Sequence, residues 1–576
     1  MKKRVLIAIA VLALVVAGGY LFIRYRFLKT RDFKPDTTKQ KSVLDLRPSI
    51  IAKLQQLVKD GSNGLYILSV EQLDPDVLSS KVDLTNTSIR IDTAAMLHLD
   101  SLHLLPDDIF TFRFASAHID GLGIEDLLHK DRVNIKEIII DDPFINIYHK
   151  KRSYNQAERE YKSHLTLYER IKGSMKKISI SNIAFTNATV TNHNLRENKT
   201  SKFTAVSVKV SDLLIDSSTQ HDKTRFLFAK QTVIHTRKYS VPTVDSLYFF
   251  KVDDITIAGE QHTVTAGDVE LVPRYTREQF EHRIQYKQDF YQFNFPKVIL
   301  RDIDWLALMN NEKFSSGRID IAGGTFSDFL DRSVKVGPSV QVNNFPHQLL
   351  MHIPFNVFVS RININHVNVA YTEFNPVSAS SGTAYFDNIN GQFNNVTNIP
   401  AEIRKHPVST FTATAAFMHH VPMKANFTFD LSRYKTGEFS VAVTMDTLDN
   451  TTVNKIAEPL GPFIIKTGTM QHVDLHIRGN NFKASGDITM LYDNLHITPL
   501  KKDNKGEGEM KNKNVTSLLA NILFIKNENP KGSEVRMAQF SIARESHSNF
   551  FNLIWTATLT GVLKTIGIPV KFVMKK

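Results

Sequence analysis

Residues 178–185 read ISISNIAF, residues 208–215 read VKVSDLLI and residues 250–257 read FKVDDITI. Each stretch places two apolar residues on alternate positions, then a polar pair, then two more apolar residues on alternate positions. Alternation with period two is typical of a β-strand with one buried face, because successive side chains point to opposite faces. The same pattern recurs at residues 138–145, 298–305, 362–369 and 490–497, and in a looser form at residues 384–391.

The polar pair in the middle of the pattern shifts the alternation by one residue. Without a correction, the second half of the strand would turn its apolar side chains to the other face of the sheet. A β-bulge restores the face, and Asp, Asn and Gly suit a bulge because they tolerate left-handed backbone. We therefore predict bulges that bend the sheet into a trough. The alternative is a tight turn at each pair, between short strands of a β-sandwich.

The sequence also contains a longer repeat, which includes copies of the eight-residue pattern. Residues 114–145 align without gaps to residues 295–326, at an offset of 181 residues (295 − 114 = 181). Two tandem copies of one β unit explain this match, because self-similarity at a fixed period is typical of repeat architectures. We predict a mainly β fold, an elongated and curved repetitive sheet in which each strand contacts its neighbours.

The N-terminus contains one long apolar run, residues 5–23, that carries no charge. This run matches the roughly 20 residues that cross a bilayer as a helix. We predict a retained transmembrane anchor, and a cleaved signal peptide is the alternative. Basic residues flank the run on both sides, and a simple count of them would place the rest of the chain in the cytoplasm.

Composition narrows the function classes. The chain has 576 residues, a formal net charge of +13 and no cysteine. It therefore has no disulfide framework, thiolate metal site or cysteine nucleophile. Lysine and arginine are scattered, which favours anionic lipid heads or acidic partners over nucleic acid. No HExxH, GxSxG or Walker A motif occurs. We expect no enzymatic activity, no metal site, no cofactor and no nucleic-acid partner.

Three further stretches carry a resemblance: VILRDIDWLALMNNEKFSSGRIDIAGG (298–324), SRININHVNVAYTEFNP (360–376) and RMAQFSIARESHSNFFNLIWTATLTGVLKTIG (536–567). In order and extent, the chain resembles the AsmA-like family of Gram-negative envelopes, the superfamily that includes AsmA, TamB and YhdP. The resemblance implies a periplasmic β-groove of the β-taco type, anchored in the inner membrane by a single pass. It also implies phospholipid binding, lipid transport between membranes, a part in outer-membrane biogenesis and integrity, and an envelope or outer-membrane protein partner.

The apolar positions of the pattern are the candidate site. In a closed sandwich they would be ordinary core, whereas in an open trough they would line a groove for acyl chains. The predicted groove residues are Ile138, Ile140, Ile178, Ile180, Ile183, Phe185, Val208, Val210, Phe250, Val252, Ile255, Val298, Leu300, Ile303, Ile362, Ile364, Val367 and Val369. In the C-terminal stretch, Phe551, Trp555 and Leu559 share one helical face and are predicted to lie at a membrane interface or to cap the groove.

These observations give a linear organisation for the chain. Helices are expected within residues 48–60, 153–173 and 273–290 and from residue 548 onward. The predicted segments are a cytoplasmic tail (1–4), the anchor (5–23), a juxtamembrane segment with a helix (24–64), two β-groove regions (65–290 and 291–500), a disordered polar loop (501–514) and C-terminal strands with an amphipathic helix (515–576). An envelope scaffold or assembly factor that binds protein partners is the alternative to the lipid-binding function.

Overall fold

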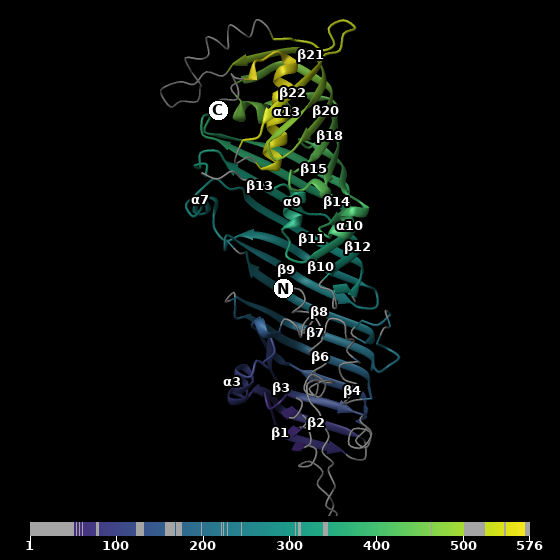
Figure 1. The fold of residues 1–576 in the computed structure, drawn as a ribbon. Helices are drawn as coiled ribbons and strands as arrows, with labels where there is room; N and C mark the ends of the chain where they lie inside the picture. Colours follow the sequence, from purple (N-terminus) through teal and green to yellow (C-terminus); the bar gives the residue numbers. More distant parts are fainter. Residues whose placement is uncertain are drawn as a thin grey trace, which may run out of the picture. The chain divides into compact units, whose positions relative to one another are not determined.

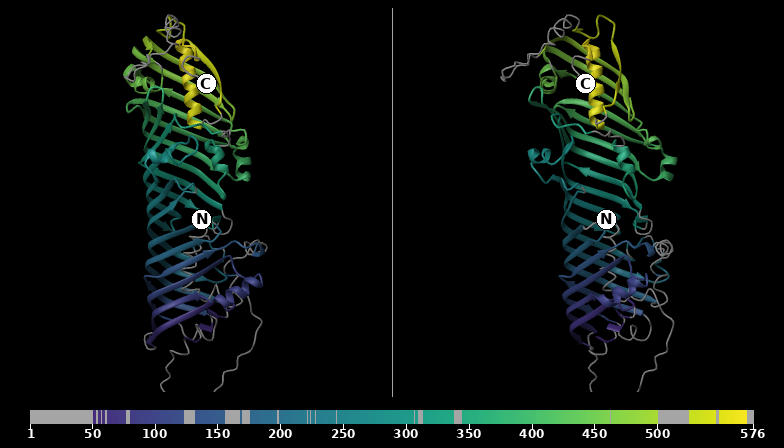
Figure 2. Two further views of the ribbon diagram at one scale, coloured as in Figure 1. Left: turned by 90° about the vertical axis from the view of Figure 1, so that its left-hand side faces the viewer. Right: turned by 60° about the vertical axis from the view of Figure 1, so that its left-hand side comes forward.

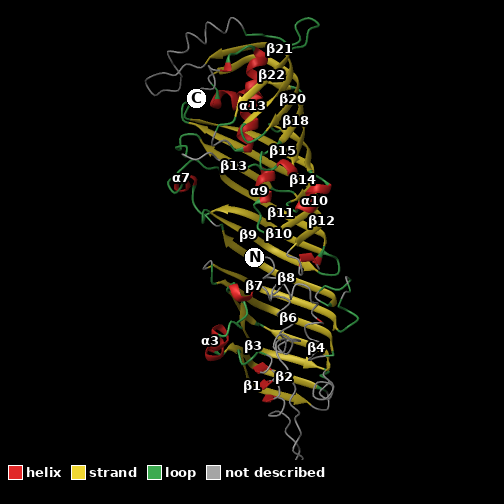
Figure 3. Ribbon diagram, viewed as in Figure 1, coloured by secondary structure: helices red, strands yellow, loops and turns green. Residues whose placement is uncertain are grey.

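The protein is mainly β. The computed structural model describes residues 51–570 with gaps, the longer of which are 123–131, 156–175 apart from Tyr168, 309–312, 338–343 and 500–524. In the described part, 22 strands belong to one large mixed sheet, accompanied by short helices (Figures 1 and 3). The predicted anchor and the polar loop 501–514 lie outside the described residues. No described helix combines the length and the hydropathy needed to cross a membrane.

The chain divides into two compact units. Unit 1 comprises Met1–Val241, Val252–Ala266 and Arg301–Lys313, and unit 2 comprises Pro242–Lys251, Gly267–Leu300 and Phe314–Lys576. Five strands carry residues of both units: β9 (Tyr248–Ala258), β10 (Thr263–Pro273), β11 (Phe290–Ile303) and, by one terminal residue each, β8 (Ala229–Pro242) and β12 (Lys313–Ala322).

Unit 1 begins with antiparallel strands. β1 pairs with β2 and β2 with β3, and β3 then pairs with two short strands in turn, β4 and β5. Both short strands run parallel to β6, which pairs antiparallel with β7, and β7 with β8. The elements are β1 (Tyr66–Asp76), β2 (Lys81–Ile91), α3 (Thr93–Ser101), β3 (Asp108–Asp120), β4 (Arg132–Asp141), β5 (Phe144–His149), η1 (Ser153–Asn155), β6 (Lys177–Asn194), β7 (Lys199–Ile215) and β8 (Ala229–Pro242).

Unit 2 continues with longer antiparallel ladders. Each strand from β14 to β17 pairs with the next one along the chain, up to β18. Both β18 and β19 pair with β20, β20 pairs with β21, and β21 pairs with β22. The strands are β12 (Lys313–Ala322), β13 (Thr325–Asp331), β14 (Asn356–Asn375), β15 (Ser380–Thr397), β16 (Val408–Phe417), β17 (Val421–Asp430), β18 (Phe439–Met445), β19 (Leu448–Asp449), β20 (Phe463–Gly479), β21 (Lys483–Pro499) and β22 (Met537–Ala543). The helices are α7 (Arg277–Glu281), α9 (Pro346–Met351), α10 (Pro400–Lys405), η2 (Leu431–Arg433), α11 (Asn450–Leu460) and α13 (Phe550–Ile566).

The two aligned segments of sequence contain the same strands. β4 and β12 begin 181 residues apart (313 − 132), and so do β5 and β13 (325 − 144). In both copies the second short strand is antiparallel to the long strand before it and parallel to the one after it. A parallel pair needs a long crossover, and the connections 150–176 and 332–355 are long enough to supply it.

Left-handed backbone occurs at the polar pair, where the alternation shifts by one residue. We call this shift the slip. In six of the stretches, the second residue of the polar pair has a φ between 46° and 54°. Asp and Asn tolerate this conformation better than most residues because their short side chains bond locally. The six residues are Asp142, Asp212, Asp302, His366, Asn388 and Asn494.

The slip takes more than one form. Register shifts between Ile364 and Val367 of β14 confirm a bulge there. Between β6 and β7 the register stays constant from Ile178 to Phe185, because both strands slip at the same height and Ile180 and Ile183 face buried partners on β7; it shifts only beyond Phe185. At residues 138–145 the strand is interrupted, and β4 ends before β5 begins. A bulge at every pair was therefore too simple a prediction.

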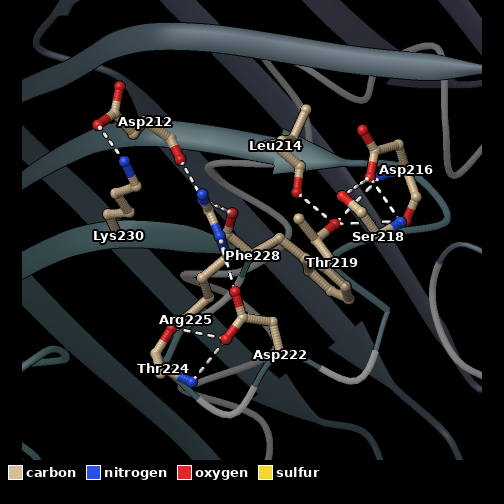
Figure 4. Close-up of polar contacts among 10 residues, drawn as sticks. All are labelled: Asp212, Leu214, Asp216, Ser218, Thr219, Asp222, Thr224, Arg225, Phe228 and Lys230. Atoms are coloured by element: carbon tan, nitrogen blue, oxygen red, sulfur yellow. Dashed lines mark hydrogen bonds and ion pairs between the residues drawn. The ribbon is translucent and has the colours of Figure 1, made fainter.

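A buried guanidinium stabilises the slip in β7 (Figure 4). Arg225 donates from Nη1 to the carbonyl of Asp212 (2.7 Å) and to that of Phe228 (3.2 Å). Its Nε donates to Asp222 Oδ2 at 3.2 Å, and only 10% of the side chain is exposed. Lys230 Nζ lies 3.6 Å from Asp212 Oδ2. The connection between β7 and β8 thus supplies a partner for the carbonyl of the left-handed residue.

The predicted helices differ in outcome. The described residues within 51–59 are helical, and α13 confirms the helix predicted from residue 548. Residues 273–290 hold only the short helix α7, since β10 ends at Pro273 and β11 begins at Phe290. Most of the helix predicted over 153–173 lies outside the described residues.

Candidate functional site

Eight of the predicted groove residues are fully buried. All eight lie on β4, β6 and β7 of unit 1, and none is more than 2% exposed. Burial this complete is that of a close-packed core. These residues are Ile138, Ile140, Ile178, Ile180, Ile183, Phe185, Val208 and Val210.

The remaining predicted residues, on β9, β11 and β14, are less uniformly buried. Val252, Ile303 and Val367 are buried. The others keep intermediate exposure, namely Phe250, Ile255, Val298, Leu300, Ile362, Ile364 and Val369. Ile255 also lines a small apolar cavity of about 50 Å³ in unit 1. Solvent therefore reaches part of the predicted row, and that part lies toward the middle of the chain.

Unit 2 contains an apolar cavity of about 200 Å³. Its walls come from strands β18 to β21 and from helices α11 and α13. The space exceeds the roughly 150 Å³ of apolar cavities that stay dry and bind small apolar molecules. Apolar side chains dominate the lining, including Val453, Leu460, Met470, Val473, Ile488, Met490, Trp555, Leu559 and Val562, and Arg332 is the charged residue among the lining side chains.

Helix α13 forms one wall of this cavity. Asn549 caps its start by accepting a hydrogen bond from the backbone N–H of Asn552 (2.7 Å), and left-handed Gly567 ends it. The helix lies against the sheet at β20 to β22 (Figures 1 and 2). Of the three predicted interface residues, Trp555 and Leu559 line the cavity, whereas Phe551 is 50% exposed. Contact of this face with a membrane stays a prediction.

A buried polar row, which the sequence analysis missed, lies on three strands of unit 2. Tyr291 of β11 is opposite Asp328 of β13, and Asp328 is opposite Tyr371 of β14. Glu373 lies two residues beyond Tyr371 and so faces the same side. Asp328 and Glu373 are each only 2% exposed. We call Asp289, Tyr291, Asp328, Tyr371 and Glu373 the acidic row.

Hydrogen bonds hold the two ends of the acidic row. Tyr291 Oη donates to Asp289 Oδ2 (2.9 Å), and Tyr371 Oη donates to Glu373 Oε1 (2.6 Å). Two side chains at the start of α13 add donors to the same oxygens: Asn549 Nδ2 to Asp289 Oδ2 (2.9 Å) and Asn552 Nδ2 to Glu373 Oε1 (3.3 Å). Helix α13 therefore contacts both the acidic row and the apolar cavity.

The electrostatics of the acidic row disfavour negative charge at its centre. Burial, together with the charges of Asp289 and Glu373, raises the pKa of Asp328 to about 8. Burial and the charge of Glu373 raise the pKa of Tyr371 well above its ordinary value. Both shifts have the same cause, because a low-dielectric site with adjacent carboxylates penalises each further anion.

The sequence contains a signal for this row. Val367, Val369, Tyr371 and Glu373 alternate along one strand, so the inward face that begins apolar ends in a tyrosine and a carboxylate. A buried carboxylate on the apolar face is the informative exception in such a pattern. Only the pairing of β11, β13 and β14 brings Asp289 and Asp328 to the same place.

Comparison with known proteins leaves the family open. No protein-family model matches the chain, and no curated protein shows significant similarity to it. Within the described residues, no three His, Asp or Glu side chains are arranged to hold a metal ion.

Proposed function

We propose that this protein is a non-enzymatic lipid-binding protein of the cell envelope. In this proposal, residues 5–23 anchor the chain in the inner membrane and the β body lies in the periplasm. Acyl chains lie against the apolar face of a curved, groove-forming sheet, and the protein assists phospholipid movement between membranes. The resemblance to the AsmA-like family supports this assignment.

The apolar cavity of unit 2 is the observation that carries the proposal. A space of about 200 Å³ with aliphatic and aromatic walls offers water few hydrogen-bonding partners. Each CH₂ group transferred into it from water contributes about 0.8 kcal/mol. The partly exposed apolar residues on β11 and β14 offer a further surface on which an acyl chain would gain this energy.

Site-specific photocrosslinking in cells tests the proposal. A photoreactive residue replaces Ile364, Val369 or Leu559, and Ala370, which follows Val369 on the opposite face of β14, is the matched control. We expect lipid adducts at the first three positions and none at Ala370. A folded, abundant protein that forms no lipid adduct at any position would refute lipid binding.

A protein partner is the second candidate, and the C-terminal strand favours it. Met537 at the start of β22 is 55% exposed, and Val535, two residues before the strand, is 53% exposed. An exposed sheet edge adds a partner strand through main-chain hydrogen bonds, and contacts with alternate side chains give the pairing its specificity. Protein adducts at Met537 without lipid adducts in the cavity would favour the scaffold function.

A further inference from the structure

Asp328 lacks partners at a depth where a carboxylate needs them. Both of its carboxylate oxygens, and Oδ1 of Asp289, are buried and accept no hydrogen bond from the described residues. An unpaired buried charge is costly unless a counter-ion is present. The acidic row therefore has unused capacity to accept hydrogen bonds, concentrated at its centre.

Positive charge from the protein does not fill this need. Among the described residues, the guanidinium of Arg332 is the cation that the structure pairs with the row, and its Nη1 lies 3.8 Å from Glu373 Oε2. The arginine side chain is 45% exposed, so solvent screens the pair. Arg332 also lines the apolar cavity. The acidic row therefore has three carboxyl groups, those of Asp289, Asp328 and Glu373, and one partly exposed guanidinium to balance them.

The surroundings of Asp328 suit an organic cation. Its two direct cross-strand neighbours are the aromatic residues Tyr291 and Tyr371. Aromatic faces attract ammonium groups, and carboxylates accept hydrogen bonds from them. No three described His, Asp or Glu side chains are arranged as metal ligands, which favours a larger cation over a metal ion.

The position of the row beside the cavity indicates how such a cation is attached. Arg332 contacts both regions, since it pairs with Glu373 and lines the cavity. On α13, Asn552 bonds Glu373, and Trp555, three residues later, lines the cavity. An amphiphile with its chain in the cavity would place its polar end near Arg332 and the acidic row.

We propose that the acidic row binds the ammonium group of a phospholipid headgroup while Arg332 contacts the phosphate and the acyl chains enter the cavity. This inference rests on the proposed lipid-binding function and names its substrate class. The ammonium pairs with Asp328, whose direct neighbours on the adjoining strands are Tyr291 and Tyr371. A headgroup without an amine leaves Asp328 unpaired and binds less tightly.

Competition binding with the purified full-length protein tests the inference. The protein is incubated with vesicles that contain lipids of identical acyl chains and ethanolamine, choline or glycerol headgroups, and the retained lipids are counted by mass spectrometry. We expect ethanolamine lipid to exceed glycerol lipid by about tenfold, which corresponds to about 1.4 kcal/mol. Choline lipid retained as well as ethanolamine lipid would support ring contacts as the main attraction, and choline lipid retained no better than glycerol lipid would support hydrogen bonding by the primary ammonium.

Asp328→Asn is the diagnostic variant. It removes the ionisable carboxyl group without changing the shape of the side chain, and we expect it to fold, to retain lipid and to lose the headgroup preference. Asp331→Asn, on the same strand at the opposite parity, is the control and should keep the preference. Glu373→Gln provides a second test of the headgroup preference. The glutamine oxygen still accepts the hydrogen bond of Tyr371, so the variant removes a carboxylate of the acidic row and keeps this contact.

The outcomes distinguish the ammonium site from the lipid-binding function on which it rests. Lipid retention with no headgroup preference in the wild type, or with a preference that survives both Asp328→Asn and Glu373→Gln, would overturn the ammonium site and leave the lipid-binding function intact. A protein that retains no lipid from any vesicle would overturn both.

Discussion

Replacing Asp212 with valine tests whether a left-handed residue sets the path of β7. Asp212 has a φ of 52°, and its side chain is 59% exposed, so the change removes no buried contact. Left-handed backbone costs an ordinary residue about 1–2 kcal/mol, and it is least tolerated by β-branched side chains. Relative to Asp212→Asn, which loses the same charge, we expect Asp212→Val to lower the free energy of unfolding of unit 1 by about 1–2 kcal/mol.

The two tryptophans allow this unit to be measured alone. Trp305 belongs to unit 1 and Trp555 to unit 2, so fluorescence in a Trp555→Phe background reports on unit 1. Trp305 is buried, and its Nε1 donates to the carbonyl of Gly259 at 3.0 Å. With a urea m-value of about 3 kcal/mol/M, the midpoint should fall by about 0.3–0.7 M.

Two further variants make the experiment decisive. Lys209→Val, at an exposed and regular position of the same strand, should leave the midpoint unchanged or raise it, since valine favours strands. Asp212→Gly should be at least as stable as Asp212→Asn, because glycine adopts positive φ without strain. Equal midpoints for the valine variants at 209 and 212 would refute the backbone explanation.

Three other predictions concern packing and charge. Arg225→Ala should destabilise unit 1 by about 1–3 kcal/mol in the same fluorescence assay, because it leaves the carbonyls it bonds unpaired; an unchanged midpoint would contradict this. Leu563→Ala, at a fully buried position of α13, should cost about 2–5 kcal/mol and accelerate amide exchange along the helix, whereas the exposed Phe551→Ala should not. Asp328 has a raised pKa, so the folded state retains its proton to higher pH than the unfolded state and stability falls as pH rises from about 4 to 8. Burial lowers the pKa of His347 to about 4, which acts in the opposite direction below about pH 6.5. Between pH 6.5 and 8, the free energy of unfolding measured by urea titration should therefore fall by about 1.4 kcal/mol per pH unit in the wild type, and Asp328→Asn should abolish this fall. An equal pH dependence in the wild type and the variant would rule out this role for Asp328.

Local physics explains what the sequence predicts well. Period-two alternation reports strands because strand geometry itself has period two, and it persists whatever the strand pairs with. The middle pair predicts left-handed backbone at Asp142, Asp212 and Asn494 because that preference belongs to the residue. Amphipathic spacing predicts α13 for the same reason. The offset of 181 residues predicts which strands recur.

Tertiary structure decides how each apolar residue is used. Ile180 and Ile364 occupy equivalent places in the same pattern, yet Ile180 is 1% exposed and Ile364 is partly open. Exposure depends on what packs across the sheet, and no local pattern contains that information.

The sequence by itself determined the strand-rich composition of the fold, the positions of its slips and its C-terminal helix, because these follow from preferences of neighbouring residues. Only the tertiary structure placed Asp328 between Tyr291 and Tyr371 and brought α13 against the acidic row and the cavity. Those groups are up to 260 residues apart in the chain. Their proximity arises from strand pairing and helix packing, which depend on the whole sheet.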